Sequence, residues 1–198
     1  MAVLTRISAG RGWDRLRHAW ASFVALGLLC ATAPGASAPP AASPEYQVKA
    51  VFLFNFAQFV EWPAQAFREA TSPLIIGVLG EDPFGTYLDD LVNGEKVGGR
   101  PLAIRRYRRA EDLSGCHIVF ICRSEAGHLD KIMAGLKGRS LLTVSDIETF
   151  TRQGGMVRFA MENGRVRLRI NPEPAKAAEL TISSKILRPG TIVTAGKD

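Results

Sequence analysis

The chain has 198 residues, of which 46% are hydrophobic, and it carries a formal charge of +6. Four arginines and one aspartate of that balance lie within residues 1–38, so the remaining 160 residues carry a charge of only +3. This charge is too small for the basic surface of a nucleic-acid-binding protein. A length of about 160 residues suits one domain with a single substantial core. The composition therefore predicts one domain without a nucleic-acid partner.

Residues 1–38 have the pattern of a secretion signal. A basic start precedes an apolar run at residues 19–31, which is too short to remain in a bilayer as a span. Ala36-Ser37-Ala38 then matches a cleavage site, so we expect release into the periplasm. An uncleaved anchor and a lipid anchor on Cys30 are the alternatives. A lipoprotein signal needs a small residue before the cysteine, and Leu29 is not small.

Residues 46–62 predict an amphipathic helix that ends before Pro63. Its apolar residues recur at helical spacing and form the expected buried stripe of Val48, Val51, Phe52, Phe56, Phe59 and Val60. Phe54 and Trp62 lie off this stripe. They are therefore candidates for a partner surface, although packing in the core is the simpler explanation, because aromatic stripes usually are core.

Strands and helices are expected to alternate after this helix. The expected strands cover residues 74–79, 102–107, 116–122 and 141–144, and the expected helices cover residues 86–92, 110–113, 125–136 and 146–152. This alternation predicts an α/β fold in which a mainly parallel sheet carries helices on both faces.

An antiparallel hairpin is expected near the end of the domain, followed by a helix over residues 173–180. Asn163-Gly164 separates two extended runs, 156–161 and 165–170, and this dipeptide is the strongest short hairpin signal. The twofold period of a strand places the hairpin arginines on one face, namely Arg158, Arg165, Arg167 and Arg169. This face is either a solvated surface or a docking surface for an acidic protein partner.

No complete catalytic, nucleotide-binding or metal-binding motif occurs in the sequence. Residues 80–86 have the glycine spacing of a phosphate loop, but Thr86 stands where that loop needs a lysine. His117 lies inside an expected strand, and His128 fits a surface or packing position better than an acid–base role. We therefore expect no cofactor, no metal and no enzymatic activity.

Polar side chains nevertheless follow three of the expected strands. They are Glu81, Asp82, Arg123, Ser124, Ser145 and Asp146. Parallel sheets bind ligands beyond the carboxyl ends of their strands, so these residues are candidates for a ligand cleft. Helix capping by Ser124 and Asp146 is the simpler alternative. A small-molecule sensor, or a small hydrolase that uses Asp82, Ser145 or Asp146, is the competing functional class.

Cys116 and Cys122 lie at the two ends of one expected strand. Six residues of strand separate their α-carbons by roughly 20 Å, whereas a disulfide requires less than about 7 Å. We therefore expect two buried free thiols rather than a disulfide or a metal site.

Several motifs, in one order along residues 46–187, resemble those of the YfiR family of exported proteins. They are Tyr46-Gln47-Val48-Lys49-Ala50-Val51-Phe52-Leu53-Phe54-Asn55-Phe56, Phe59-Val60-Glu61-Trp62-Pro63, Asp82-Pro83-Phe84-Gly85, Gly99-Arg100-Pro101-Leu102, Cys116-His117-Ile118-Val119-Phe120-Ile121, Leu142-Thr143-Val144-Ser145-Asp146, Gly154-Gly155-Met156-Val157, Ile170-Asn171 and Ile182-Ser183-Ser184-Lys185-Ile186-Leu187.

The resemblance implies a Rossmann-like three-layer sandwich over residues 45–190, between a disordered leader at 39–44 and a disordered tail at 191–198. It also implies a periplasmic regulator that represses a membrane-bound diguanylate cyclase by binding the cyclase's periplasmic sensor region, and that is sequestered by an outer-membrane lipoprotein. The family also occurs beside other signalling receptors, such as sensor kinases, and a homodimer is left open. A disulfide-bonded relative has cysteines that this chain lacks around Ile76 and 147–153, so redox control does not carry over.

Overall fold

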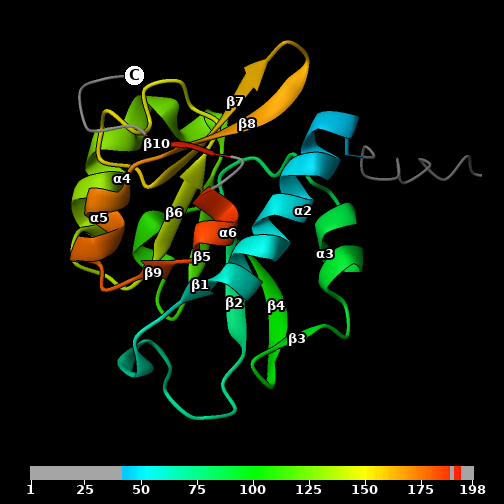
Figure 1. Ribbon diagram of the computed structural model, residues 1–198, viewed down its shortest axis with the longest axis vertical. Coiled ribbons are helices and arrows are strands. Elements are labelled where there is room, and N and C mark those ends of the chain that lie inside the picture. The colour runs from blue at the N-terminus through cyan, green and yellow to red at the C-terminus, as the bar shows by residue number, and fades with distance from the viewer. Residues whose placement is uncertain (1–41, 188–189, 193–198) are drawn as a thin grey trace, which may run out of the picture. The chain divides into compact units, whose positions relative to one another are not determined.

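The computed structural model describes residues 42–187 and 190–192, and it gives no side-chain detail for residues 187 and 190–192 (Figure 1). All of these residues belong to one of the two units of the chain, Pro39–Asp198. The expected secretion signal with Cys30, most of the leader and residues 193–198 of the tail lie outside the described residues. No helix in the described part is long and apolar enough to cross a membrane.

An eight-stranded mixed sheet forms the centre of the fold, in the order β10-β8-β7-β6-β5-β2-β4-β3 (Figure 1). Its strands are β2 (Leu74–Leu79), β3 (Lys96–Val97), β4 (Arg100–Tyr107), β5 (Ile118–Ile121), β6 (Leu142–Ser145), β7 (Val157–Glu162), β8 (Arg165–Ile170) and β10 (Gly190–Ile192). The pairs β3–β4 and β7–β8 are antiparallel, and the other five neighbouring pairs are parallel. The predicted α/β class and the hairpin are therefore confirmed. The Rossmann-like three-layer sandwich remains a prediction.

The helices are α2 (Pro44–Phe59), α3 (Tyr87–Val92), α4 (Leu129–Leu136), α5 (Pro172–Ala177) and α6 (Ser184–Leu187). Short 3-10 turns are η1 (Ala64–Ala66), η2 (Ala110–Asp112) and η3 (Arg123–His128). A separate two-stranded ribbon, which the sequence did not predict, joins β1 (Val60–Glu61) to β9 (Thr181–Ile182). It ties the end of α2 to the segment that follows α5.

Buried side chains form two clusters, because alternate residues of each central strand point to opposite faces of the sheet. Ile118 and Phe120 of β5 belong to the first cluster, together with residues of α2, α3, α5 and α6. Val119 and Ile121 belong to the second, which α4 covers. Helices therefore cover both faces of the sheet.

The predicted end of the first helix is wrong, and its predicted face is correct only in part, since Phe56 and Val60 are buried as expected. Helix α2 ends at Phe59, because Val60 and Glu61 pair with β9 instead. Val48 and Val51, which were expected to be buried, have exposed fractions of 46% and 39%. The buried side of α2 is Lys49, Ala50, Leu53, Phe56 and Ala57. The helix is apolar on most sides, so the spacing of its apolar residues does not define one buried face. Contacts with the sheet determine which face is buried.

The predicted helix over residues 146–152 is also wrong, because this segment forms successive turns before β7. Gly155 brings it back onto itself by donating its N–H to the carbonyl of Phe150 at 2.8 Å. The Phe150 ring lies so close to Gly155 that an added Cβ would sit 2.3 Å from it. Only glycine fits at position 155, because any side chain would collide with the Phe150 ring. A compact turn therefore replaces the predicted helix.

Candidate functional site

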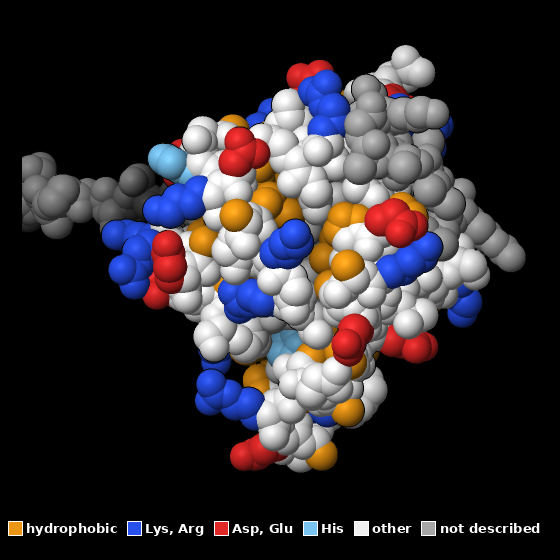
Figure 2. All heavy atoms as spheres, turned by 90° about the vertical axis from the view of Figure 1, so that its left-hand side faces the viewer, with side chains coloured by type: hydrophobic (Ala, Val, Ile, Leu, Met, Phe, Trp, Pro, Cys, Tyr) orange, Lys and Arg blue, Asp and Glu red, His pale blue; other side chains and the backbone are white. Residues whose placement is uncertain are grey.

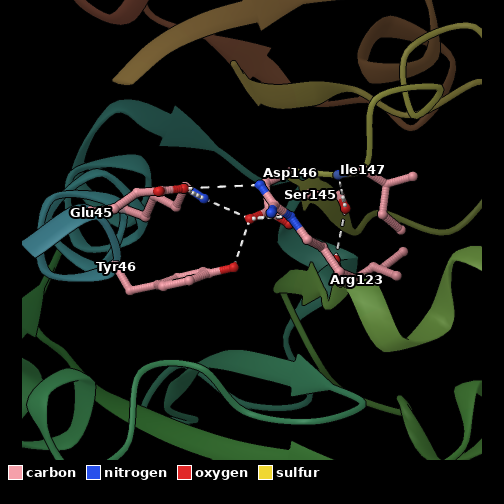
Figure 3. Close-up of polar contacts among 8 residues, drawn as sticks. Glu45, Tyr46, Arg123, Ser145, Asp146 and Ile147 are labelled. Atoms are coloured by element: carbon pink, nitrogen blue, oxygen red, sulfur yellow. Dashed lines mark hydrogen bonds and ion pairs between the residues drawn. The ribbon is translucent and has the colours of Figure 1, made fainter. Parts of the chain in front are cut away.

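Five polar residues meet where the start of α2 faces the ends of β5 and β6, and we call them the ion cluster (Figure 3). They are Glu45, Tyr46, Lys49, Arg123 and Asp146. The Lys49 ammonium lies 2.5 Å from Glu45 Oε1 and 2.5 Å from Asp146 Oδ2. The Tyr46 hydroxyl donates to Asp146 Oδ2 at 2.9 Å, and Arg123 Nε lies 3.2 Å from the same oxygen. Two carboxylates thus face two cations.

Local structure brings the ion cluster together from three segments. Glu45 and Lys49 are four residues apart on α2, and Tyr46 is three residues before Lys49, so the three share one side of the helix. Arg123 and Asp146 each follow a strand, and those strands, β5 and β6, are parallel neighbours with Ile121 opposite Ser145. The cluster therefore fixes the first helix against the carboxyl ends of two central strands.

The buried charges of Lys49 and Asp146 stabilise one another, because neither is exposed to solvent. The side chains of Lys49 and Asp146 are completely inaccessible, whereas 61% of the Arg123 side chain is exposed. A buried charge is tolerated only when it is paired and hydrogen-bonded. Burial also raises the pKa of Tyr46, and the nearby Asp146 carboxylate raises it further. Tyr46 therefore remains a protonated donor near neutral pH.

The contacts of the ion cluster suit the positioning of α2 more than chemistry. Ser145, the one hydroxyl beside Asp146 in the predicted cleft, is buried and already engaged. It donates to the carbonyl of Ile121 at 2.7 Å and accepts the N–H of Ile147 at 3.1 Å. One oxygen, Asp146 Oδ1, is buried without a hydrogen-bond partner among the described residues. Within the same residues, no three His, Cys, Asp or Glu side chains are grouped as metal ligands.

The remaining cleft residues lie in two other small groups. Ser124 Oγ accepts the N–H of Glu81 at 3.0 Å, which joins the loops that follow β2 and β5. Gly80 permits this approach, because an added Cβ would lie 2.4 Å from Ser124 Oγ. Asp82 instead accepts from Arg106 Nε at 2.6 Å. Ser145 has its own contacts with Ile121 and Ile147, so the structure divides the six predicted residues among four sets of contacts. Their role as one ligand cleft remains a prediction.

The capping alternative for two of these residues is wrong. Asp146 precedes turns rather than a helix, and its carboxylate binds Lys49. Ser124 lies inside the short turn η3, whose first flanking residue is Cys122. Tertiary contacts, not caps, therefore account for both side chains.

The arginine face of the hairpin consists of Arg158, Arg165, Arg167 and Arg169. Burial alternates along β8 as predicted, with Leu168 and Ile170 buried and Arg165 and Arg167 exposed. Glu162 forms an ion pair with Arg169 at 2.6 Å. Within the described residues, Arg165 and Arg167 form no ion pair. In Figure 1 this end of the hairpin extends beyond the rest of the sheet.

Phe54 and Trp62, the other candidates for a partner surface, are both partly buried. Phe54 packs against the first hydrophobic cluster. The Trp62 indole N–H donates to the carbonyl of His117 at 3.1 Å, and the two rings meet edge to face at 6.2 Å. Trp62 thus has a structural partner, and the interface role of both residues remains a prediction.

Both cysteines of the domain are buried and free, as the sequence predicted. Burial raises the pKa of the Cys116 thiol to about 12 and also raises that of Cys122. Neither thiol is therefore ionised near neutral pH, and ionisation is what makes a cysteine reactive.

The sequence analysis missed three members of the ion cluster, namely Glu45, Tyr46 and Lys49. One signal was available, because Lys49 is a charged residue inside an otherwise apolar helix and Glu45 stands four positions before it. Its partner Asp146 is 97 residues away in the chain. Local periodicity cannot reveal such a pair.

One family model matches most of the described chain. The family model described as YfiR/HmsC-like matches residues 46–190. No curated protein matches the chain. The matched range includes most of the ion cluster and the whole hairpin.

Proposed function

The chain belongs to the YfiR/HmsC-like family, and we propose that it is a periplasmic regulatory protein that represses a membrane-bound diguanylate cyclase. In this proposal the protein binds the periplasmic sensor region of the cyclase and performs no catalysis. An outer-membrane lipoprotein that competes for the repressor would relieve the repression. A sensor kinase is the alternative receptor.

The observation that carries this proposal is a pair of exposed arginines, without ion pairs among the described residues, on a projecting hairpin. Arg165 and Arg167 are exposed and form no ion pair within the described part of the chain. The ion cluster, in contrast, pairs its charges internally. Exposed charge of one sign steers an oppositely charged protein toward its docking site. The hairpin therefore supports a partner surface that recognises an acidic patch.

The proposal is tested in cells by deleting the gene and measuring cyclic di-GMP. Deletion should raise the nucleotide level in a strain with a cognate cyclase, and the wild-type gene should restore it. A variant with Arg165→Glu and Arg167→Glu should be expressed at the same level but should not restore repression. An unchanged nucleotide level after deletion, in a strain that demonstrably expresses the protein, would remove this pathway.

A matched control distinguishes the effect of charge at the arginine face from the effect of the same change in net charge elsewhere on the surface. Arg108 and Lys131 are also exposed and form no ion pair among the described residues, but they lie at β4 and α4. The variant with Arg108→Glu and Lys131→Glu has the same change of charge and should repress normally. Equal repression by both double variants would assign the partner surface elsewhere, with Phe54 and Trp62 as the next candidates.

Association kinetics with the purified sensor region give a second test. Rim charges mainly set the association rate and its dependence on salt. The hairpin double variant should associate more slowly than the wild type at low salt and should lose most of the salt dependence. Identical rates for both proteins across a salt series would contradict steering by the arginine face.

Export is the premise of a periplasmic role, and intact mass checks it. The periplasmic protein should begin near residue 39. A species that still begins near Met1, or one with lipid on Cys30, would place the protein at a membrane instead.

A further inference from the structure

A cavity of about 510 Å³ lies between α4 and α5, and none of its lining residues belongs to the ion cluster. Its walls are mainly apolar, with Met133 and Leu136 from α4, Met156 from the start of β7, and Ala177 and Ala178 from α5. Figure 2 looks onto this side of the molecule and shows hydrophobic side chains that reach the surface between Lys and Arg side chains. The volume lies within the range of small-molecule sites, roughly 300–1,000 Å³.

Cations without partners stand at the mouth of this α4–α5 cavity. Lys137 and Arg152 are exposed lining residues, and neither forms an ion pair among the described residues. The third cation, Arg139, donates to the carbonyl of Leu113 at 2.5 Å. The two lining carboxylates are engaged, because Asp130 accepts from Gln153 Nε2 at 2.7 Å and Glu173 pairs with Lys176 at 2.9 Å. The amide of Gln153 is neutral, so Asp130 keeps its charge. The lining therefore carries three cations and two carboxylates, of which Glu173 is paired with Lys176, and its net charge is positive.

The base of the cavity adds a polar group. Thr143 is buried there, and its Oγ1 accepts the N–H of Met156 at 3.2 Å. Its hydroxyl proton has no acceptor among the described residues, so it can donate to a ligand. The cavity thus combines apolar walls, the Thr143 hydroxyl as a donor, and two cations without ion pairs among the described residues, Lys137 and Arg152. A ligand that matches it has an apolar body and an anionic group.

We infer that the α4–α5 cavity binds an anionic amphiphile, which is a small molecule with an apolar body and a carboxylate, phosphate or sulfonate group. The apolar body fills the space between the helices, and the anionic group lies at the mouth beside Lys137 and Arg152. This inference does not depend on the proposed function, because the cavity shares no residue with the ion cluster or the arginine face.

The cavity has a direct structural link to the hairpin. Met156 and Asn171 both line it, and the N–H of Asn171 donates to the carbonyl of Met156 at 2.8 Å. This bond closes the open end of the β7–β8 pair, next to the pairing of Val157 with Ile170. A ligand in the cavity therefore contacts the two residues from which the hairpin extends.

Calorimetric titration of the purified protein with three probes of equal chain length tests the inference. The probes are decanoate, decanol and decyltrimethylammonium, which are anionic, neutral and cationic. Decanoate should bind with a stoichiometry of one, decanol at least about tenfold more weakly, and the ammonium probe not measurably, because charge-assisted hydrogen bonds strengthen only the anion's binding. Equal affinities for decanoate and decanol, or no binding of either, would overturn the inference.

Variants locate the site and provide the control. Lys137→Gln with Arg152→Gln should weaken decanoate binding by about tenfold or more and leave decanol binding unchanged. Ala177→Phe, at an exposed position of α5, should fill the mouth and abolish binding of both probes, while circular dichroism confirms an unchanged fold. Arg108→Gln with Lys131→Gln should bind decanoate as the wild type does. Wild-type affinity in the Ala177→Phe variant would place the ligand outside this cavity.

Discussion

The ion cluster and the arginine face are built from similar side chains but arrange charge in opposite ways. In the ion cluster, Lys49 and Asp146 are fully buried and each charge faces an opposite one within 4 Å. On the arginine face, four cations share one side of a hairpin, and Arg158 lies directly opposite Arg169 in the β7–β8 register. The first region satisfies its charges within the chain, whereas Arg165 and Arg167 of the second are exposed and form no ion pair among the described residues.

This difference separates a structural role from a binding role. Buried ions are costly to leave unpaired, so the ion cluster should be sensitive to any change in its composition. Exposed like charges are solvated and screened, so they affect folding little and encounters with other molecules more. Stability measurements and binding measurements should therefore respond to different mutations.

The largest expected effect is on Lys49. Lys49→Met should lower the free energy of unfolding by about 3–5 kcal/mol, because it leaves the buried Asp146 carboxylate without its main cation. Urea unfolding measures the change. Lys131→Met, on the exposed side of α4, is the control and should change stability by no more than about 0.5 kcal/mol. A loss below about 1 kcal/mol for Lys49→Met would mean that the ion cluster does not hold α2 to the sheet.

A smaller effect is expected for Tyr46→Phe. This change removes one hydrogen bond to a charged acceptor and should lower the free energy of unfolding by about 1.5–3 kcal/mol. Urea unfolding of Tyr46→Phe in the wild-type and Asp146→Asn backgrounds forms a double-mutant cycle. If the two mutations are additive, the Tyr46 hydroxyl and Asp146 are not coupled in solution.

Lowering the pH should weaken the core while the arginines remain charged. Burial lowers the pKa of His117, so the unfolded chain takes up this proton at a higher pH than the folded protein does. Its contribution to stability is therefore complete above about pH 6.5 and is lost as the pH falls from there toward the folded-state pKa, by at most about 1.4 kcal/mol per pH unit. Unfolding of the wild type and His117→Gln at pH 7.5 and 5.5 isolates this contribution. An equal loss in both proteins would exclude His117 as its source.

The smallest effect on stability is expected at the arginine face. Arg165→Ala with Arg167→Ala should change the free energy of unfolding by no more than about 0.5 kcal/mol, because both side chains are exposed and form no ion pair among the described residues. Urea unfolding of this double variant and of Lys49→Met under the same conditions compares the two losses of stability directly. A loss near that of Lys49→Met would show that these arginines have a structural role.

The hairpin illustrates what the sequence can predict. Asn163 and Gly164 have positive φ angles of 51° and 71°, as a tight two-residue turn requires, and local chemistry determines this turn. The alternation of arginines with apolar residues then follows from the strand period. The α/β alternation was predictable for the same reason, because each strand and helix carries its own pattern.

The ion cluster illustrates what the sequence could not predict. Lys49 and Asp146 meet only after α2 packs across the sheet, and no local pattern records that contact. The exposed position of Val48 and the pairing of Val60 with Ile182 have the same cause, since each depends on contacts between distant segments. Contacts between distant segments, rather than a local period, determine all three features.

The arginines of β8 lie near the outer edge of the sheet, and this position has a further consequence. On the side of β8 that faces away from β7, strand β10 pairs only with Leu168, Arg169 and Ile170, and no described strand pairs with Arg165–Arg167 on that side. An open strand edge can recruit a strand from another molecule and so begin aggregation, and charged side chains at the edge discourage this. The residues that we assign to partner recognition would therefore also keep copies of the protein apart at high concentration.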